Sequence, residues 1–506
     1  MRKILILSTL FISIIGYSQS EIKNETTYKK RVLETTEIDM ISSFYSQNGD
    51  NAAVTGGIGN EKLTDIATNF VVSIPLNDDD VFTVDATISA YTSASSSNLN
   101  PFDYSGSTFK NENGDKDRDE DKSNSKNKGG FNAKSGASQS NTNNVANRGA
   151  TPWVESTGAS RSDVWVNGTF NYSHSSDDRN TIINGNLSIS HEYDYQSFGI
   201  GGGIAKLFNQ KNTEIGLKGN VYLDTWNPRY PTEIYSYITA NENLNAGFFS
   251  GVDILDQSGS IIDKNSANVW MPINTTLVTD KKRNSYAASL SFSQIISKKA
   301  QLSLFVDVVQ QSGWLSNPMQ RVYFGDRANY YIGNANSIHN YTSKNNTDVF
   351  QLADDIERLP NTRLKIPIGA RFNYYINEKL TLRTYYRYYS DDWGINSQTA
   401  SIELPFKISD NFTLYPSYRY YTQTKAKYFA PFEQHVSTEQ FYTSDYDLSE
   451  YNSSQVGFGI SYTDIFAKRH IGKFGLKNID LKYSNYQRNT GLSSGIVSLG
   501  FKFVMD

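Results

Sequence analysis

The chain has 506 residues, a formal net charge of −4, no cysteine, and 13% aromatic residues at a mean hydropathy of −0.52. The absence of cysteine excludes disulfides, a lipid-modified cysteine anchor and thiolate metal sites, and the mildly acidic balance argues against a nucleic-acid-binding protein. No stretch after the N-terminus approaches the roughly 18–20 apolar residues that a membrane-spanning helix needs, whereas an aromatic-rich chain of low hydropathy fits a transmembrane β-barrel.

The N-terminus has the pattern of a secretory signal peptide. Two basic residues precede an apolar run over residues 4–15, and small residues follow at Gly16 and Ser18. We therefore expect residues 1–18 to be removed on export. Residues 19–35 would then form a periplasmic segment, and residues 36–506 the membrane domain.

From residue 36 onward the chain is dominated by alternation of apolar and polar residues. The stretch from Phe82 to Ala90 alternates without a fault, which is the period of a β-strand with two unlike faces. The sequence predicts an all-β fold, a transmembrane antiparallel β-barrel of about sixteen strands. The predicted strands lie at 36–46, 66–76, 80–91, 161–174, 181–195, 197–208, 213–225, 283–297, 300–313, 362–376, 379–391, 397–408, 411–424, 453–466, 473–486 and 493–504.

The connections between these segments differ in length in a regular way. Those after even-numbered strands are short, such as 77–79 and 377–378, and most of those after odd-numbered strands are long. Short turns on one side and long loops on the other are typical of a bacterial outer-membrane barrel, with the turns in the periplasm. We therefore predict a bacterial outer-membrane location, with the lipid bilayer as the first partner.

The longest connection, residues 92–160, is rich in Ser, Asn, Gly, Asp and Lys, and we expect it to be a mobile polar extracellular loop. Four alternating aspartates within it resemble loops that bind calcium through oxygen ligands. Basic residues interleave with them and no closing glutamate follows, which favours a solvated charged loop over a metal site. These aspartates are Asp115, Asp117, Asp119 and Asp121.

The loops 226–282 and 314–361 are instead rich in aromatic residues, among them Trp226, Trp270 and Trp314. Aromatic side chains in such number pack against another part of the protein or against a partner protein. They would fold into the lumen as a constriction or cap the barrel mouth, or they would form a docking surface for another protein. Within the second loop, a short helix is predicted with Asn346 or Thr347 as its cap, Val349, Leu352, Ala353 and Ile356 on one face and Pro360 at its end.

The stretch 381–394, TLRTYYRYYSDDWG, has two unlike faces. Tyr386 and Tyr388 would belong to the outer aromatic girdle in lipid, whereas Arg383 and Arg387 must face the lumen. An arginine on the lipid face near the midplane would cost roughly 2–4 kcal/mol. Because this strand runs outward, its end would lie at the outer rim, with the motif Asp391, Asp392 and Trp393.

Charged residues on the predicted inward faces are the most informative feature for function. A basic wall would hold Arg371, Arg383, Arg387 and Arg419 around one acid, Glu403, and if residues 391 and 397 pair, Glu403 lies near residue 385. The earlier strands would direct Asp85, Glu192 and Asp194 inward from the opposite wall. Such walls would set up a transverse field that sorts polar solutes. Alternatively, the charges pair across the interior and close it.

Histidine and serine give little support for an enzyme. The chain has five histidines, none with the spacing of a helical metal site. His191 with Ser190 or Ser197 is a loose candidate for a hydrolase at the rim. We expect neither a cofactor nor a catalytic site.

Several motifs resemble those of a known family of bacterial outer-membrane proteins, domain-of-unknown-function family 3570. The resemblance rests on residues 386–395 (YRYYSDDWGI), residues 419–424 (RYYTQT) leading to Tyr428 and Phe429, Leu359-Pro360 with Arg363, and residues 192–195 (EYDY) with Ser197. It spans most of the mature chain. Gln398 stands where the family pattern often has a histidine, so a role for that imidazole is in doubt here. The resemblance implies an outer-membrane barrel and no established activity.

The sequence thus favours a channel, or a scaffold within an envelope complex, with a charged lumen. The alternatives are a surface receptor acting through its long loops and, less favoured, a barrel hydrolase. The last strand, 493–504, ends in aromatic residues and resembles the signal that the outer-membrane assembly machinery recognises. That machinery and an envelope protein are the expected protein partners.

Overall fold

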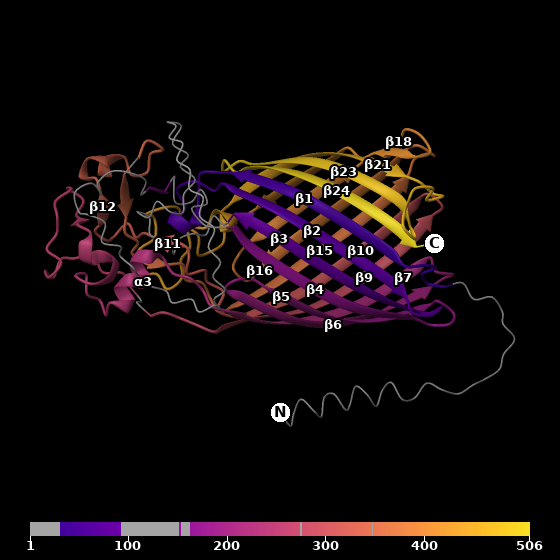
Figure 1. Ribbon diagram of the computed structural model, residues 1–506, viewed down its shortest axis with the longest axis horizontal. Coiled ribbons are helices and arrows are strands. Elements are labelled where there is room, and N and C mark those ends of the chain that lie inside the picture. The colour runs from indigo at the N-terminus through magenta and orange to yellow at the C-terminus, as the bar shows by residue number, and fades with distance from the viewer. Residues whose placement is uncertain (1–30, 93–150, 153–161, 274–275, 347, 506) are drawn as a thin grey trace, which may run out of the picture.

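Sixteen strands form one closed antiparallel barrel in the structure, a computed structural model that describes residues 31–92, 151–152, 162–273, 276–346 and 348–505 (Figure 1). Among these residues no helix has the length and apolar character needed to cross a membrane. The barrel strands are β1 (Glu37–Asn48), β2 (Leu63–Pro75), β3 (Asp80–Thr92), β4 (Ser162–Ser175), β5 (Thr181–His191), β6 (Tyr195–Phe208), β7 (Thr213–Trp226), β9 (Lys281–Ser297), β10 (Ala300–Gly313), β15 (Thr362–Tyr375), β16 (Thr381–Asp391), β17 (Asn396–Glu403), β20 (Ser417–Gln423), β21 (Tyr451–Thr463), β23 (Phe474–Arg488) and β24 (Ser493–Met505).

The first and last strands close the ring. β1 pairs with β2 on one side and with β24 on the other, in an unbroken antiparallel register from Glu37 opposite Val504 to Asn48 opposite Ser493. Each remaining barrel strand pairs with its neighbours along the chain. The predicted barrel and its strand number are confirmed.

The two faces of each strand meet different surroundings, as the alternation predicts. Apolar side chains such as Ile88, Leu217 and Leu481 point away from the barrel axis and are exposed, as a lipid-facing band requires. Their neighbours in the chain, such as Thr87, Lys218 and Lys482, point into the lumen. The band of apolar residues around a closed barrel places the protein in the outer membrane.

Short connections gather at one end of the barrel and longer ones at the other, the extracellular end. On the periplasmic side the turns between β2 and β3, β6 and β7, and β9 and β10 are tight. Three small strands extend this end: β18 (Phe406–Lys407), β19 (Phe412–Leu414) and β22 (His470–Ile471). The first barrel strand therefore begins, and the last barrel strand ends, on the periplasmic side.

The long loops fold into one body beyond the extracellular end of the barrel, which we call the cap. Figure 1 shows β11, β12 and α3 of the cap at the barrel end opposite the C-terminus. The cap comprises the described parts of 49–62, 227–280, 314–361 and 424–450. Its elements are η1 (Ala53–Thr55), α3 (Thr232–Thr239), η2 (Gly247–Gly251), β8 (Ile254–Leu255), β11 (Arg321–Val322), β12 (Tyr331–Gly333), η3 (Ala335–Asn340), β13 (Val349–Gln351), β14 (Asp355–Ile356) and η4 (Tyr446–Leu448).

The helix predicted after Asn346 is wrong. Residues there form β13, which pairs with β12, and β14, which pairs with β11. Val349 and Phe350 favour strands by propensity, and both are fully buried once paired. The apolar spacing therefore reports burial between two small sheets and not a helical face.

The predicted strand 181–195 also ends earlier than expected. β5 stops at His191, and residues 192–194 form a tight turn in which the amide of Glu192 donates to the carbonyl of Tyr195 at 2.8 Å. Glu192 and Asp194 consequently lie in the turn at the extracellular end and not along the lumen wall.

Candidate functional site

The predicted basic wall comes together on four neighbouring strands. Arg371 on β15 lies opposite Tyr385 on β16, which lies opposite Ser401 on β17, and Ser401 lies opposite Arg419 on β20. One row nearer the outer end, Arg387 lies opposite Thr399. Because these positions share one parity along their strands, all of the side chains face the lumen.

One ion pair forms within this wall. Arg383 lies directly opposite Glu403, two residues from the level expected, and its Nη1 donates to Glu403 Oε1 at 2.9 Å. The Arg383 side chain nevertheless remains 52% exposed. The pair is therefore solvated, and the lumen wall at this level is not a packed interior.

The other arginines of the wall have no carboxylate partner within the described residues. Arg371 lies near two stacked rings, 5.9 Å from the centroid of Phe305 and 5.7 Å from that of Tyr385. Arg419 is exposed to the lumen, and Nε of Arg387 is buried without a hydrogen-bond partner. The wall therefore carries uncompensated positive charge.

The three predicted opposite acids are not brought together. Asp85 faces the lumen from β3, half-way round the ring from β16, and accepts a hydrogen bond from Asn69 Nδ2 at 2.6 Å. At the outer turn Glu192 accepts from the Tyr91 hydroxyl, and Asp194 accepts from Trp226 Nε1 at 3.2 Å. Asp65, a lumen acid that the sequence analysis does not single out, lies opposite Tyr91, nearer the outer end than Asp85, and accepts from Ser89 Oγ at 2.6 Å.

The outer-rim motif builds a clamp around Asp391. Both Nε and Nη2 of Arg363 donate to Asp391 Oδ2, at 2.9 and 2.6 Å, and the amide of Ile395 donates to Oδ1 at 2.9 Å. The guanidinium of Arg363 lies 4.3 Å from the centroid of the Trp393 ring. Charge-assisted hydrogen bonds and ring stacking together fix this hairpin.

The same motif attaches the cap to the barrel. Asp392 Oδ1 accepts from the amide of Leu364, and Lys427 of the cap donates through Nζ to the carbonyl of Asp392 at 2.9 Å. Gly394 has φ +94° with Lys427 packed against it, a conformation that favours glycine. The motif therefore has a positioning role at the junction of cap and barrel.

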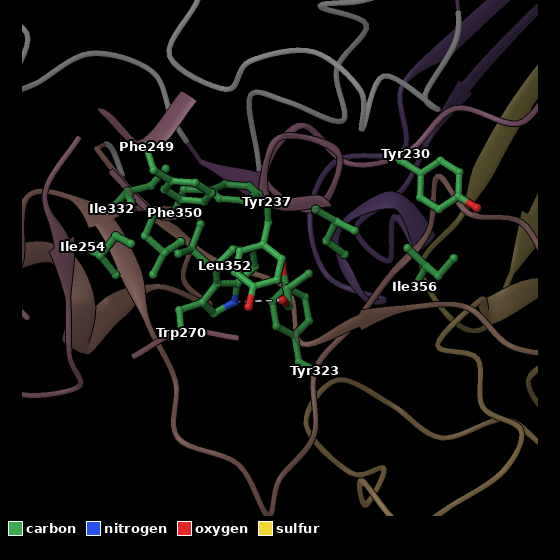
Figure 2. Close-up of a cluster of buried hydrophobic side chains, with 13 residues drawn as sticks. Tyr230, Tyr237, Phe249, Ile254, Trp270, Tyr323, Ile332, Phe350, Leu352 and Ile356 are labelled. Atoms are coloured by element: carbon green, nitrogen blue, oxygen red, sulfur yellow. Dashed lines mark hydrogen bonds between the residues drawn. The ribbon is translucent and has the colours of Figure 1, made fainter. Parts of the chain in front are cut away.

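The cap has a hydrophobic core of its own. Figure 2 shows Phe249, Phe350 and Trp270 gathered in one cluster, and each of them is almost completely buried. The ring centroids of Trp270 and Phe249 are 5.2 Å apart, and Trp270 Nε1 donates to the carbonyl of Ala353 at 3.0 Å. The two aromatic-rich loops therefore pack against each other and cap the mouth of the barrel, which is one of the arrangements expected from the sequence.

A buried ion pair joins three segments of the cap. Arg321 on β11 donates through Nε and Nη2 to the two carboxylate oxygens of Glu233 on α3, at 2.6 and 3.0 Å. Its Nη1 donates to the carbonyl of Val54 in η1 at 2.8 Å. Both side chains are essentially fully buried, at 0% and 1% exposure. Sequence reasoning missed this pair because its members lie in different loops.

Three carboxyls with altered pKa values lie within the cap. Glu357 accepts from Thr443 Oγ1 at 2.6 Å and from the amide of Asn317 at 2.7 Å, and burial raises its pKa to about 8. Burial likewise raises the pKa of Asp445 and of Asp354 to about 6. We therefore expect the stability of the cap to depend on pH.

The weak catalytic and metal candidates differ in outcome. His191 and Ser190 are neighbours on β5 and so point to opposite faces of the strand, which prevents them from acting as base and nucleophile. In the described ranges no three histidine or acidic side chains are grouped as metal ligands. The four aspartates from Asp115 to Asp121, and the predicted signal peptide, lie outside the described residues.

Comparison with solved structures finds several outer-membrane proteins at low identity. A bacterial polysaccharide outer membrane secretin shares 8% identity, covering 93% of this chain and 99% of that chain at a TM-score of 0.38. A BenF-like porin from Pseudomonas fluorescens Pf-5 shares 8% identity, covering 94% and 100% at 0.35. Pseudomonas aeruginosa OpdK with vanillate shares 9% identity, covering 94% and 99% at 0.33.

Sequence comparison places the chain in a family. The family described as "Protein of unknown function (DUF3570)" matches residues 3–494, nearly the whole chain. No curated protein matches the sequence.

Proposed function

The chain belongs to the DUF3570 family, and on the premise of its outer-membrane barrel we propose that it is a channel for small polar solutes. Its lumen prefers anions, and its outer mouth is covered by the folded cap. The solute reaches the lumen wall through the junction of cap and barrel.

The uncompensated arginines of the lumen carry this proposal. A barrel closed by its own charges would pair them, because an unpaired buried cation is costly. Arg371 and Arg419 are instead exposed on the lumen face without a carboxylate partner within the described residues. A water-exposed positive wall attracts anions and repels small cations.

Planar-bilayer recordings under a KCl gradient test the proposal. The purified protein should conduct, with a reversal potential on the anion-selective side. The triple variant Arg371→Gln, Arg387→Gln, Arg419→Gln should lose most of this preference because the wall becomes neutral. Lys218→Gln, which removes a charge from lumen-facing β7 outside the wall, should change it much less. A silent wild-type protein would refute the channel, and a cation-selective one would refute its preference for anions.

A scaffold or receptor is the second candidate, and the folded cap favours it. The cap has its own core and is held by the Arg321–Glu233 pair, so it presents a defined surface to the outside. In this case one envelope or surface partner would copurify in fixed stoichiometry from native membranes. The lumen triple variant would then leave both that complex and envelope permeability unchanged.

The assembly machinery remains a proposed partner through β24, whose Phe501 and Phe503 stack at a centroid distance of 6.4 Å. Phe503→Asp should reduce the folded fraction in the outer membrane, read as heat-modifiable gel mobility. Ser498→Asp, on the lumen face of the same strand, is the matched control.

A further inference from the structure

A cavity of about 430 Å³ lies where the outer end of the lumen meets the cap. Its lumen side is formed by β1, β21, β23 and β24, and its cap side by η1 and by the loops that contain Gln320 and Asp445. A solute entering from outside would meet this cavity before the basic wall. Concave sites of this size that combine apolar surface with a few converging polar groups are typical of ligand pockets.

Planar polar side chains line the cavity from both sides. Carboxamides and carboxylates predominate, and one guanidinium faces them. These groups are Gln47, Gln320, Gln455, Glu61, Asp445, Asp447 and Arg488. Together they offer both donors and acceptors of hydrogen bonds.

Protein contacts fix these groups and leave some of their capacity unused. Gln320 Nε2 donates to Asp445 Oδ2 at 3.0 Å, whereas Gln320 Oε1 is buried with no partner in the described part of the chain. Arg488 Nη1 donates to Asp447 Oδ1 at 2.8 Å, and the Asp447 side chain remains 71% exposed. Glu61 Oε2 accepts from the amide of Asn51 at 2.9 Å. The site is therefore preorganised, which lowers the entropic cost of binding.

Two tyrosines supply flat apolar surface beside these polar groups. The Tyr45 hydroxyl donates to Gln47 Oε1 at 2.6 Å, and the Tyr486 hydroxyl accepts from Arg488 Nε at 3.3 Å, so both rings are held in place. Val54 and Ile496 add aliphatic surface. Aromatic rings edged by planar hydrogen-bonding groups suit a ligand with a C–H face and a rim of hydroxyls.

The charged groups of the cavity already have protein partners, since Asp447 is paired with Arg488 and Asp445 accepts from Gln320 Nε2. The buried acceptor that is left without a partner in the described part of the chain, Gln320 Oε1, is uncharged and suits a hydroxyl donor. We propose that the cavity binds a neutral, hydroxyl-rich solute, a sugar residue. The inference goes beyond the proposed function, because binding of a neutral sugar does not depend on the charge preference of the lumen.

Isothermal titration of the purified full-length protein tests the binding. The detergent should be an amine oxide, because glycoside detergents carry a sugar headgroup. Glucose, N-acetylglucosamine and maltose are the neutral probes, gluconate is the anionic probe and putrescine the cationic probe. We expect at least one neutral sugar to bind with a dissociation constant of about 1 mM or lower, and neither ion to bind as tightly.

Two variants locate the site. Gln455→Leu removes a polar group and Ile496→Trp fills the cavity, and each should weaken sugar binding about tenfold or more. Gln311→Leu makes the same chemical change at the outer end of the lumen on β10 and should leave affinity unchanged. Heat-modifiable mobility checks the fold of all three.

The outcomes are distinct for the two proposals. Binding of gluconate or putrescine in preference to every sugar, no sugar binding at all, or affinity unaffected by both Gln455→Leu and Ile496→Trp would overturn the sugar site. Conductance without sugar binding leaves the channel standing and removes this inference. Sugar binding by a protein that does not conduct in bilayers supports the sugar site and refutes the channel.

Discussion

Arginine side chains lie in two different environments in this molecule. In the cap, Arg321 is completely buried and donates to both carboxylate oxygens of Glu233 and to a backbone carbonyl. In the lumen, Arg371 and Arg419 are exposed and have no carboxylate partner within the described residues. The cap therefore has the interior of a folded protein, whereas the lumen wall is an aqueous surface.

The largest effect should come from breaking the buried pair of the cap. Glu233→Ala removes the carboxylate that neutralises the buried charge of Arg321, which should destabilise the cap by about 3–5 kcal/mol. Limited trypsin digestion should then cut the cap, while gel mobility before and after boiling shows an intact barrel. Glu403→Ala, which breaks the solvated lumen pair, should cost only about 0–1 kcal/mol. Equal protease sensitivity of the two variants would show that the buried pair of the cap and the solvated pair of the lumen do not differ in their contribution to stability.

The pH dependence of the cap should be nearly as large. Burial raises the pKa of Glu357 from 4.5 to about 8, so the folded cap binds a proton that the unfolded loop has released. The contribution of Glu357 to cap stability should therefore be complete below pH 4.5, fall as pH rises between 4.5 and 8, and be level above, a total of at most about 5 kcal/mol.

Glu357→Gln isolates this effect. The amide mimics the protonated acid towards Thr443 and Asn317, so protease resistance of this variant should vary much less between pH 5.5 and 8.5. Thr443→Val is a useful comparison, because it removes the 2.6 Å hydrogen bond and keeps the titrating group. Greater resistance of the wild-type cap at pH 8.5 than at pH 5.5 would show the sign to be wrong.

A smaller effect is expected where the two regions join. Arg363→Lys keeps the charge but loses the contact with the Trp393 ring and one of the two hydrogen bonds to Asp391. The expected loss is about 1–2 kcal/mol, seen as faster amide hydrogen exchange at residues 392–396. Lys365→Arg, on the same face of β15, should leave that exchange unchanged.

The smallest effect on stability is expected in the lumen. Arg419→Gln should change the free energy of unfolding by no more than about 0.5 kcal/mol, because the side chain has no carboxylate partner to lose. It should nevertheless shift the reversal potential in bilayers toward cations. A large loss of stability would show that Arg419 belongs to a packed interior after all.

The barrel could be predicted from the sequence because lipid and water make opposite demands on adjacent residues. The alternation from Phe82 to Ala90 predicts β3, and the same period identifies the remaining strands to within a few residues. Parity likewise places Arg383, Arg387 and Glu403 on one face. The predicted level of Glu403 differs from the observed one by two residues because turn geometry, and not alternation, sets the register.

The cap could not be predicted in the same way. Arg321 and Glu233 lie 88 residues apart, and no periodicity links them. The apolar spacing of Val349 and Ile356 fits a helix as well as two short strands, and pairing with β12 and β11 decides between them. The abundance of aromatic residues indicated that these loops pack, but not which contacts they make.

The seam of the ring joins the strand synthesised first to the strand synthesised last. Until β24 arrives, β1 and β23 each present a row of unsatisfied amides and carbonyls, which neither lipid nor a neighbouring strand can satisfy. A polypeptide that lacks this final segment should therefore be prone to aggregation and proteolysis before it can insert. Closure of the ring therefore depends on β24, because both of its neighbours, β1 and β23, complete their pairing only with this strand.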